Sequence, residues 1–177
     1  KLQLEEGDVL SVKDCLYVML LQSSNQAANA LAEHVAGSRE AFAGMMNETA
    51  ASLGCRESHF VNPSGLNDPE QLTSAYDMAQ IGSAVFNNPA LLEICSSTSA
   101  TLPPTINNPN GRIYSMEHKL VVTDNSEDEN YYPSAVAGKT GYTSLAGQTL
   151  VTYAKQDDRR QVAVTLKSTQ RTHYSDT

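Results

Sequence analysis

The sequence predicts an α+β fold, in which a cluster of helices comes first and the antiparallel strands of one sheet come last. Capped segments with helical periodicity dominate residues 1–100, whereas β-prone runs fill residues 134–168. Between them, residues 101–133 are rich in Pro, Asn and acidic residues, which indicates loops. Because helices followed by strands are typical of α+β domains, we expect the sheet to pack against a helical layer.

Four segments of the first half carry helix signals. Ser11 precedes an apolar run and has Asp14 three positions later, as in a capping box. An alanine-rich segment stops at Gly37, and a third segment stops at Gly54, where glycine suits the left-handed end of a helix. We therefore expect helices after Ser11, over 26–36, over 38–54 and over 73–87.

The strands are predicted from β-prone composition near the end of the chain. The runs 148–154 and 161–166 flank Gln156-Asp157-Asp158-Arg159, which suits a hairpin connection. With 136–143 in front, these runs predict three consecutive antiparallel strands. One short strand or helix is expected at 120–122 within the loop-rich part.

Composition and charge exclude several classes of function. No apolar run approaches the roughly 18 residues that a membrane span needs. A formal net charge of −8 argues against nucleic acid as a partner, because binding to a polyanion needs a basic face. The three cysteines and four histidines have no metal-ligand spacing, so we assign no metal and no cofactor.

Two tripeptides suggest chemistry. Lys139-Thr140-Gly141 lies in a predicted edge strand, where an ammonium group would lie beside backbone groups that can pair with an extended peptide. Taken alone, the tripeptide is better explained as an exposed lysine on an edge strand. Ser23-Ser24-Asn25, at a helix break, would by itself indicate a helix cap.

Together these tripeptides carry a resemblance, since they occur in this order about 115 residues apart. The chain resembles the D-alanyl-D-alanine carboxypeptidases, the low-molecular-mass penicillin-binding proteins. The likeness extends over three long stretches, which read EEGDVLSVKDCLYVMLLQSSNQAANALAEHVAGS, HFVNPSGLNDPEQLTSAYDMAQI and AVAGKTGYTSLAGQTLVTYAK. The resemblance implies a β-lactamase/transpeptidase-like fold.

The resemblance also implies an activity and roles for residues. It implies an exported bacterial enzyme, outside the cytoplasmic membrane, that removes the terminal D-alanine of peptidoglycan stem peptides through an acyl-enzyme and binds β-lactams. The hydroxyl of Ser23 would relay protons to the leaving amine, and the amide of Asn25 would contact the substrate backbone. Lys139 would place positive charge near Ser23 and the substrate carboxylate. The residues expected to line the substrate are Thr140, Gly141, Tyr142 and Thr143.

One departure from the family pattern concerns the nucleophile. The family carries it in a Ser-x-x-Lys motif upstream of Ser-x-Asn, yet no serine of this chain has a lysine three residues later. Residues 171–177 resemble the lead-in to the family's closing helix. We therefore expect residues 1–177 to form one incomplete transpeptidase-like domain, truncated at both ends, that associates with the missing segment or with a second copy.

Two other functions stay open at this point. One is a non-catalytic binding module with the same fold, which kept the groove without the nucleophile. The other is a β-lactamase, although no acidic deacylating motif is evident. Reading the gene upstream of Lys1 separates the enzyme from the binding module, because only the enzyme needs a Ser-x-x-Lys there.

Overall fold

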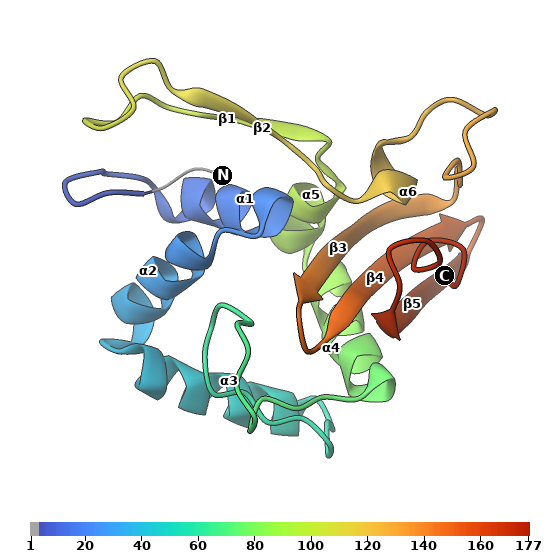
Figure 1. Cartoon of the computed structure of the whole chain (residues 1–177), viewed down its shortest axis with the longest axis horizontal. Coiled ribbons are helices and arrows are strands. Elements are labelled where there is room, and N and C mark those ends of the chain that lie inside the picture. Colours follow the sequence, from blue (N-terminus) through green and yellow to red (C-terminus); the bar gives the residue numbers. More distant parts are fainter. Residues whose placement is uncertain (1–3) are drawn as a thin grey trace.

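The computed structural model describes residues 4–177 and arranges them as helices followed by two antiparallel sheets (Figure 1). The four predicted helices and three predicted strands are confirmed, as is the short helix at 120–122. No helix within residues 4–177 is both long and apolar enough to cross a membrane. The elements are α1 Val12–Gln22, α2 Asn25–Ala36, α3 Arg39–Ser52, α4 Ala75–Asn87, α5 Pro89–Ser96, β1 Ser99–Leu102, β2 Arg112–Ser115, α6 Lys119–Val122, β3 Ala135–Thr143, β4 Gly147–Gln156 and β5 Arg159–Ser168.

Serine side chains begin the first four helices. Ser11 forms a complete capping box with Asp14 at the start of α1. The hydroxyls of Ser24, Ser38 and Ser74 each accept a backbone N–H from the first turn of the helix that follows. Because such a cap contributes about 1 kcal/mol, the helix starts are fixed by local sequence.

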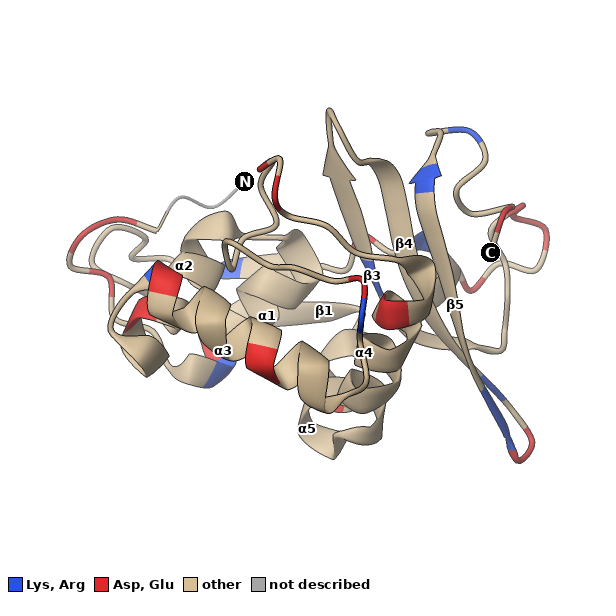
Figure 2. Ribbon diagram, turned by 90° about the horizontal axis from the view of Figure 1, so that it is seen from below, with Lys and Arg blue, Asp and Glu red and all other residues tan. Residues whose placement is uncertain are grey.

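The last three strands form one antiparallel sheet in the order β3-β4-β5. Lys139 pairs with Val151, and Thr140 pairs with Leu150, so β4 occupies one edge of β3. The β4–β5 hairpin protrudes beyond the helices, and its tip contains both acidic and basic residues (Figure 2). In the described part of the chain the other edge of β3 has no strand partner, and it faces α1 and α2 (Figure 1).

Helices α4 and α5 support the sheet from one face. Gly82 of α4 lies so close to it that a Cβ there would be 3.1 Å from Val162 and 3.2 Å from Val151. The rings of Phe86 and Tyr153 stack with centroids 5.1 Å apart. This packing holds β4 and β5 against α4.

The sequence analysis assigned no element between Asn87 and residue 101 and expected one sheet, whereas the structure has a further helix, α5, and a second sheet. Asn88 ends α4 and its Oδ1 also accepts the N–H groups of Ala90 and Leu91, so α5 begins directly with Pro89 in its first turn. Strands β1 and β2 form a separate two-stranded sheet. Each has only four residues, and burial of Leu102 and Tyr114 against α1, rather than local propensity, holds them.

Candidate active site

The first wall of the site is the junction between α1 and α2. Ser23 ends α1 in the left-handed conformation, with φ 54° and ψ 43°. Ser24 has an ordinary φ of −71° and caps α2, so its position in the motif does not need glycine. A non-glycine residue with positive φ costs about 1 kcal/mol or more, and such residues cluster at functional sites. The turn therefore separates two neighbouring serines, one that caps a helix and one that faces the sheet.

The second wall is the free edge of β3, which lies across from Ser23. The ammonium Nζ of Lys139 donates hydrogen bonds to the hydroxyl Oγ of Ser23 and, over 2.6 Å, to the carbonyl of Thr140. Lys139 and Ser23 are both half-buried. A partly desolvated ammonium interacts more strongly with its partners than an exposed one does. The two motifs are thus joined directly, although 116 residues separate them in sequence.

These walls enclose a cavity of about 510 Å³. The structure brings all the sequence-predicted site residues to it: Ser23, Asn25, Lys139, Thr140, Gly141, Tyr142 and Thr143. Asn25 is exposed at the start of α2, and Tyr142 is 68% exposed on the strand. An extended peptide placed along this strand edge would meet a lysine, two threonine hydroxyls and an amide. A second hollow of about 410 Å³ shares Ser23 and residues 140–142 with this cavity.

Behind the lysine lies a buried histidine that the sequence did not single out as functional. His118 is fully buried, and its Nε2 is 3.0 Å from the hydroxyl of Thr152 on β4. Burial, which disfavours the imidazolium, is the main cause that lowers the pKa of His118 to about 4, and the nearby charge of Lys139 acts in the same direction. A neutral imidazole therefore lies beneath the strand that carries the lysine.

The third wall is a loop whose turn was recognised in the sequence without a role. Residues 63–66 line the cavity opposite the strand. Asn62 holds this turn, because its Oδ1 accepts the N–H of Gly65 at 2.8 Å and its Nδ2 donates to the carbonyl of Leu66 at 3.1 Å. The signal was the segment around Asn-Pro-Ser-Gly, which has turn chemistry and also belongs to a stretch resembling the family.

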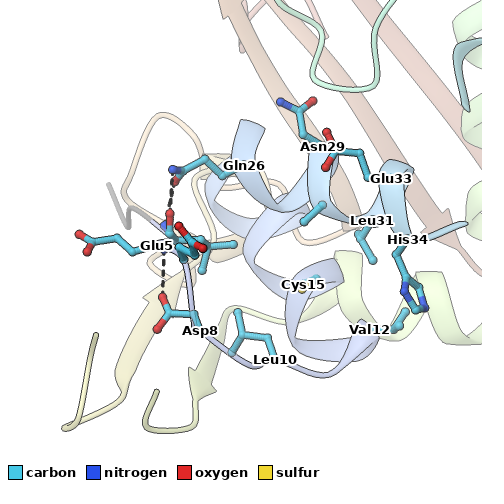
Figure 3. Close-up of a pocket in the computed structure, with 13 residues that line it drawn as sticks. Glu5, Asp8, Leu10, Val12, Cys15, Gln26, Asn29, Leu31, Glu33 and His34 are labelled. Carbon is cyan, nitrogen blue, oxygen red and sulfur yellow. Dashed lines mark hydrogen bonds between the residues drawn. The ribbon is translucent and has the colours of Figure 1, made fainter. Parts of the chain in front are cut away.

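A larger hollow elsewhere contains none of the predicted site residues. It has about 600 Å³ and lies between the N-terminal loop and helices α1 and α2 (Figure 3). The side chain of Gln26 is bonded there to the backbone N–H and carbonyl of Leu4, and Asp8 accepts the N–H of Glu5. These polar groups serve the loop itself. In residues 4–177, no three His, Cys, Asp or Glu side chains gather so that they could hold a metal ion.

Comparison with known proteins identifies relatives of the chain. A family model described as D-alanyl-D-alanine carboxypeptidase matches residues 1–170. The chain is 34% identical over 158 residues to the D-alanyl-D-alanine carboxypeptidase DacB2 of Mycobacterium tuberculosis, covering 88% of this chain and 50% of that protein. The chain spans half or less of the length of the first curated relatives that it matches.

Solved structures agree with the sequence comparison. A D-alanyl-D-alanine carboxypeptidase from Mycobacterium tuberculosis superposes with a TM-score of 0.77 at 32% identity, over 89% of this chain and 56% of that one. A mutant DD-transpeptidase from Streptomyces superposes with a TM-score of 0.88 at 24% identity, over 98% of this chain and 68% of that one, which shows the transpeptidase-like fold. The match over residues 1–170 and the shared fold show that the chain belongs to the D-alanyl-D-alanine carboxypeptidase family.

Proposed function

We propose that this chain supplies the substrate groove and the proton-relaying groups of a serine-type D-Ala-D-Ala carboxypeptidase. The observation that carries the proposal is the hydrogen bond from Lys139 to Ser23 across the free edge of β3. It joins the two motifs at a cavity of about 510 Å³ that can hold a short peptide.

The groove binds the end of the substrate peptide in this proposal. The peptide lies along the edge of β3, where it makes main-chain hydrogen bonds like an added strand. Its terminal carboxylate lies near the ammonium of Lys139 and the hydroxyl of Thr140, and Asn25 donates its amide to a peptide carbonyl. Gly141 keeps the strand open to a close approach. Tyr142 and Thr143 line the part of the peptide farther from its end.

The chemistry is acyl transfer to a serine followed by hydrolysis. The serine oxygen attacks the carbonyl carbon of the penultimate D-alanine, and the C–N bond to the terminal D-alanine breaks. The leaving amine takes a proton through Ser23, whose hydroxyl is oriented by the ammonium of Lys139. Water then hydrolyses the ester and frees the shortened peptide.

The serine that becomes acylated is not one of these 177 residues in the proposal. The family's Ser-x-x-Lys motif does not occur in this sequence. We propose that a segment outside it brings the nucleophile to the cavity between Ser23 and β3, and that residues 1–177 form a single incomplete domain of that enzyme. The substrate class is the peptidoglycan stem peptide, β-lactams compete for the groove, and the enzyme acts outside the cytoplasmic membrane, by analogy with the family.

Reaction with a fluorescent penicillin tests this function. The gene is read upstream of Lys1, and the longer product and the 177-residue chain are both incubated with the reagent. We expect a Ser-x-x-Lys upstream, covalent labelling of the longer product and no labelling of the 177-residue chain. Labelling of the short chain, or a longer product that has the motif but stays unlabelled, contradicts the proposal. A longer product without the motif indicates the binding module instead.

Two serine variants of the longer product make the test specific. Ser23→Ala removes the hydroxyl that Lys139 contacts, and we expect slower acylation by roughly 10²-fold or more, the size of a general acid–base contribution. Ser52→Ala, at the exposed end of α3, is the matched control and should label like the original protein.

A further inference from the structure

The hollow between the N-terminal loop and helices α1 and α2 is separate from the proposed peptide groove (Figure 3). Its volume of about 600 Å³ is typical of sites that bind small molecules. Among the described residues, none lines both this hollow and the groove. A molecule bound here would therefore be distinct from the peptide substrate.

Hydrogen bonds hold the loop wall of the hollow in place. The side chain of Gln26 on α2 accepts the N–H of Leu4 at 2.8 Å and donates to its carbonyl at 2.9 Å. Asp8 accepts the N–H of Glu5 at 3.1 Å, and it also accepts the N–H of Asn107, from the loop between β1 and β2, at 3.1 Å. A wall that is ordered before a ligand arrives loses less conformational entropy on binding.

One side of α2 forms the opposite wall. Its residues recur at intervals of three and four positions, which places them on one face of the helix: Gln26, Asn29, Ala30, Glu33 and His34. Because a helix rises about 1.5 Å per residue, about 10 Å separate Gln26 from Glu33 along the axis. The hollow is therefore elongated, with Gln26 and Glu33 toward opposite ends.

Apolar side chains form the middle of the hollow. Leu10 and Cys15 lie in Figure 3 between the N-terminal loop and the end of α2, and Leu4, Val12 and Leu31 also line the hollow. Burial raises the pKa of the Cys15 thiol, so the thiol stays neutral and behaves as a small apolar group. The middle therefore suits a hydrocarbon chain better than a polar group, which would lose its hydration there.

Carboxylates lie at both ends of the hollow. Glu5 and Asp8 are at the loop end in Figure 3, with Glu6 in the same loop, and Glu33 is at the other end. The described lining has no lysine or arginine, and its single imidazole belongs to the exposed His34. Within residues 4–177 the carboxylates of Glu5 and Glu6 have no hydrogen-bond or ion-pair partner. The walls therefore carry negative charge that they do not neutralise themselves.

Glu33 has one ion-pair partner, and that partner lies outside the lining. Its Oε1 is 3.5 Å from Nε of Arg39, and both side chains are more than half exposed. An exposed ion pair of this kind contributes little and is weakened by salt. The carboxylate of Glu33 can therefore still bind a cation from the side of the hollow.

These features together favour one class of ligand. An aliphatic chain suits the apolar middle, where its methylene groups leave water, and an ammonium group at each end faces a carboxylate. A metal ion does not suit the hollow, because in residues 4–177 no three His, Cys, Asp or Glu side chains gather so that they could hold one. An anion would be repelled at both ends.

We propose that the hollow between the N-terminal loop, α1 and α2 is a binding site for a linear aliphatic diamine. The loop carboxylates bind one ammonium group, Glu33 binds the other, and the hydrocarbon chain lies over Leu10 and Cys15. The site is independent of the proposed carboxypeptidase function, because it shares no described lining residue with the groove.

Titration of the ¹⁵N-labelled 177-residue chain, followed by NMR, tests this site with three probes. They are 1,8-diaminooctane, 8-aminooctan-1-ol, which has a similar length but one ammonium group, and 1,4-diaminobutane, which is too short to reach both ends. We expect 1,8-diaminooctane to shift the amides of Glu6, Cys15 and Glu33 and to leave those of Thr140 and Gly141 unchanged. It should bind about two- to fivefold more tightly than either other probe, as one additional exposed ion pair implies.

Two variants locate the second ammonium group. Glu33→Gln keeps the shape of the side chain, and it should reduce the affinity for 1,8-diaminooctane to that for 8-aminooctan-1-ol, whose single ammonium group binds at the loop end. Glu40→Gln, an exposed residue of α3 outside the lining, removes the same charge and should keep the preference for the diamine.

Four results would overturn the diamine site. They are equal affinity for 1,8-diaminooctane and 8-aminooctan-1-ol, a preference that survives in Glu33→Gln, shifts that fall on Thr140 and Gly141 instead of the hollow, and the absence of any shift at Glu6, Cys15 and Glu33. The titration is repeated on the longer product, where the same shifts are expected. Loss of binding there would show that another segment of the protein fills the hollow, which also overturns the site. None of these results bears on the penicillin test of the groove.

Discussion

The imidazole of His118 packs directly on the backbone of Gly138, the residue that precedes Lys139. A Cβ built at Gly138 would lie 2.5 Å from both Cδ2 and Nε2 of that ring, and 2.5 Å from the carbonyl oxygen of Val151. The same ring reaches Thr152, which is the β4 partner of Gly138. His118 is therefore a wedge between α6 and the strand that carries the lysine, and it requires glycine at position 138.

Gly138→Ala tests this wedge. We expect a loss of about 1 to 3 kcal/mol in the free energy of unfolding, because the methyl group overlaps a buried ring and a backbone carbonyl. Gly141→Ala is the matched control in the same strand, where the added methyl meets only the side chain of Thr149, at its hydroxyl and its Cβ. Urea unfolding of both variants checks the difference, and an equal loss at the two positions would refute the wedge.

Stability should depend on pH through His118. Its pKa is about 4 in the folded chain and 6.5 when unfolded, so between these values the unfolded chain binds more protons. The contribution of His118 to the free energy of unfolding is thus fully present above pH 6.5. It is lost as the pH falls from 6.5 through 4, by roughly 3 kcal/mol in all. Urea midpoints measured from pH 7.5 to 4.5 record this loss, and His118→Gln should flatten the curve.

Two other residues test whether the pH dependence comes from His118. His34→Gln, at the exposed end of α2, is the matched control and should leave the slope unchanged. Burial raises the pKa of Asp77, but hydrogen bonds from Glu57, Ser58 and Arg56 outweigh it and hold this pKa below its ordinary 3.8. Its contribution is lost only at more acidic pH, so the two windows separate. A slope that persists in His118→Gln between pH 7.5 and 4.5 would contradict the assignment.

Removal of the ammonium of Lys139 should weaken peptide binding. Lys139→Gln keeps a polar side chain but loses the charge that faces Ser23 and the proposed carboxylate position. A hydrogen bond to a charged group contributes about 1.5 to 3 kcal/mol, so affinity for N-acetyl-D-alanyl-D-alanine should fall about 10- to 100-fold. Lys155→Gln, an exposed lysine of β4, should bind like the original chain. Unchanged affinity in Lys139→Gln would show that the ammonium of Lys139 does not bind the peptide.

The left-handed backbone at Ser23 should lower the stability of the folded chain. Its left-handed backbone is strained for serine but not for glycine, so Ser23→Gly should be about 1 kcal/mol more stable than Ser23→Ala, while both lack the hydroxyl. Thermal unfolding of the pair measures the strain without the contribution of the side chain. Equal stability of the two variants would show that the turn is not strained.

An exposed apolar hollow should drive association of the chain. Met45 of α3 is 45% exposed, and together with Met46, Phe60 and Met78 it lines a surface hollow of about 440 Å³. We expect concentration-dependent self-association in sedimentation equilibrium, weakened by Met45→Glu. Val35→Glu, on exposed α2, is the control and should not change it. A chain that stays monomeric at all concentrations would refute this expectation.

Local chemistry made most of the fold predictable. The serine caps, the glycine stops and the period of the apolar residues act within a few positions of the chain, so α1 to α4 begin and end close to where they were expected. The missed elements depend on partners that are distant in sequence. The β1–β2 ribbon has only four residues in each strand and is held because Leu102 and Tyr114 bury against Val18 of α1. Asn88 is both the C-cap of α4 and the N-cap of α5. The sequence analysis recognised only the end of α4 at this position.

The sequence by itself determined the family resemblance, the two motifs and the candidate residues, because tripeptides and caps are read from neighbours along the chain. The resemblance already named Ser23 as the serine near Lys139, but only the tertiary structure shows the reason. A left-handed backbone turn points the hydroxyl of Ser23 at the strand, and the hydroxyl of Ser24 caps a helix. The tertiary structure also showed that residues 63–66 of the loop line the cavity beside β3 and that His118 packs on the backbone of β3. Those contacts join residues far apart in the chain, and only the packing of helices on the sheet brings them within a few ångströms.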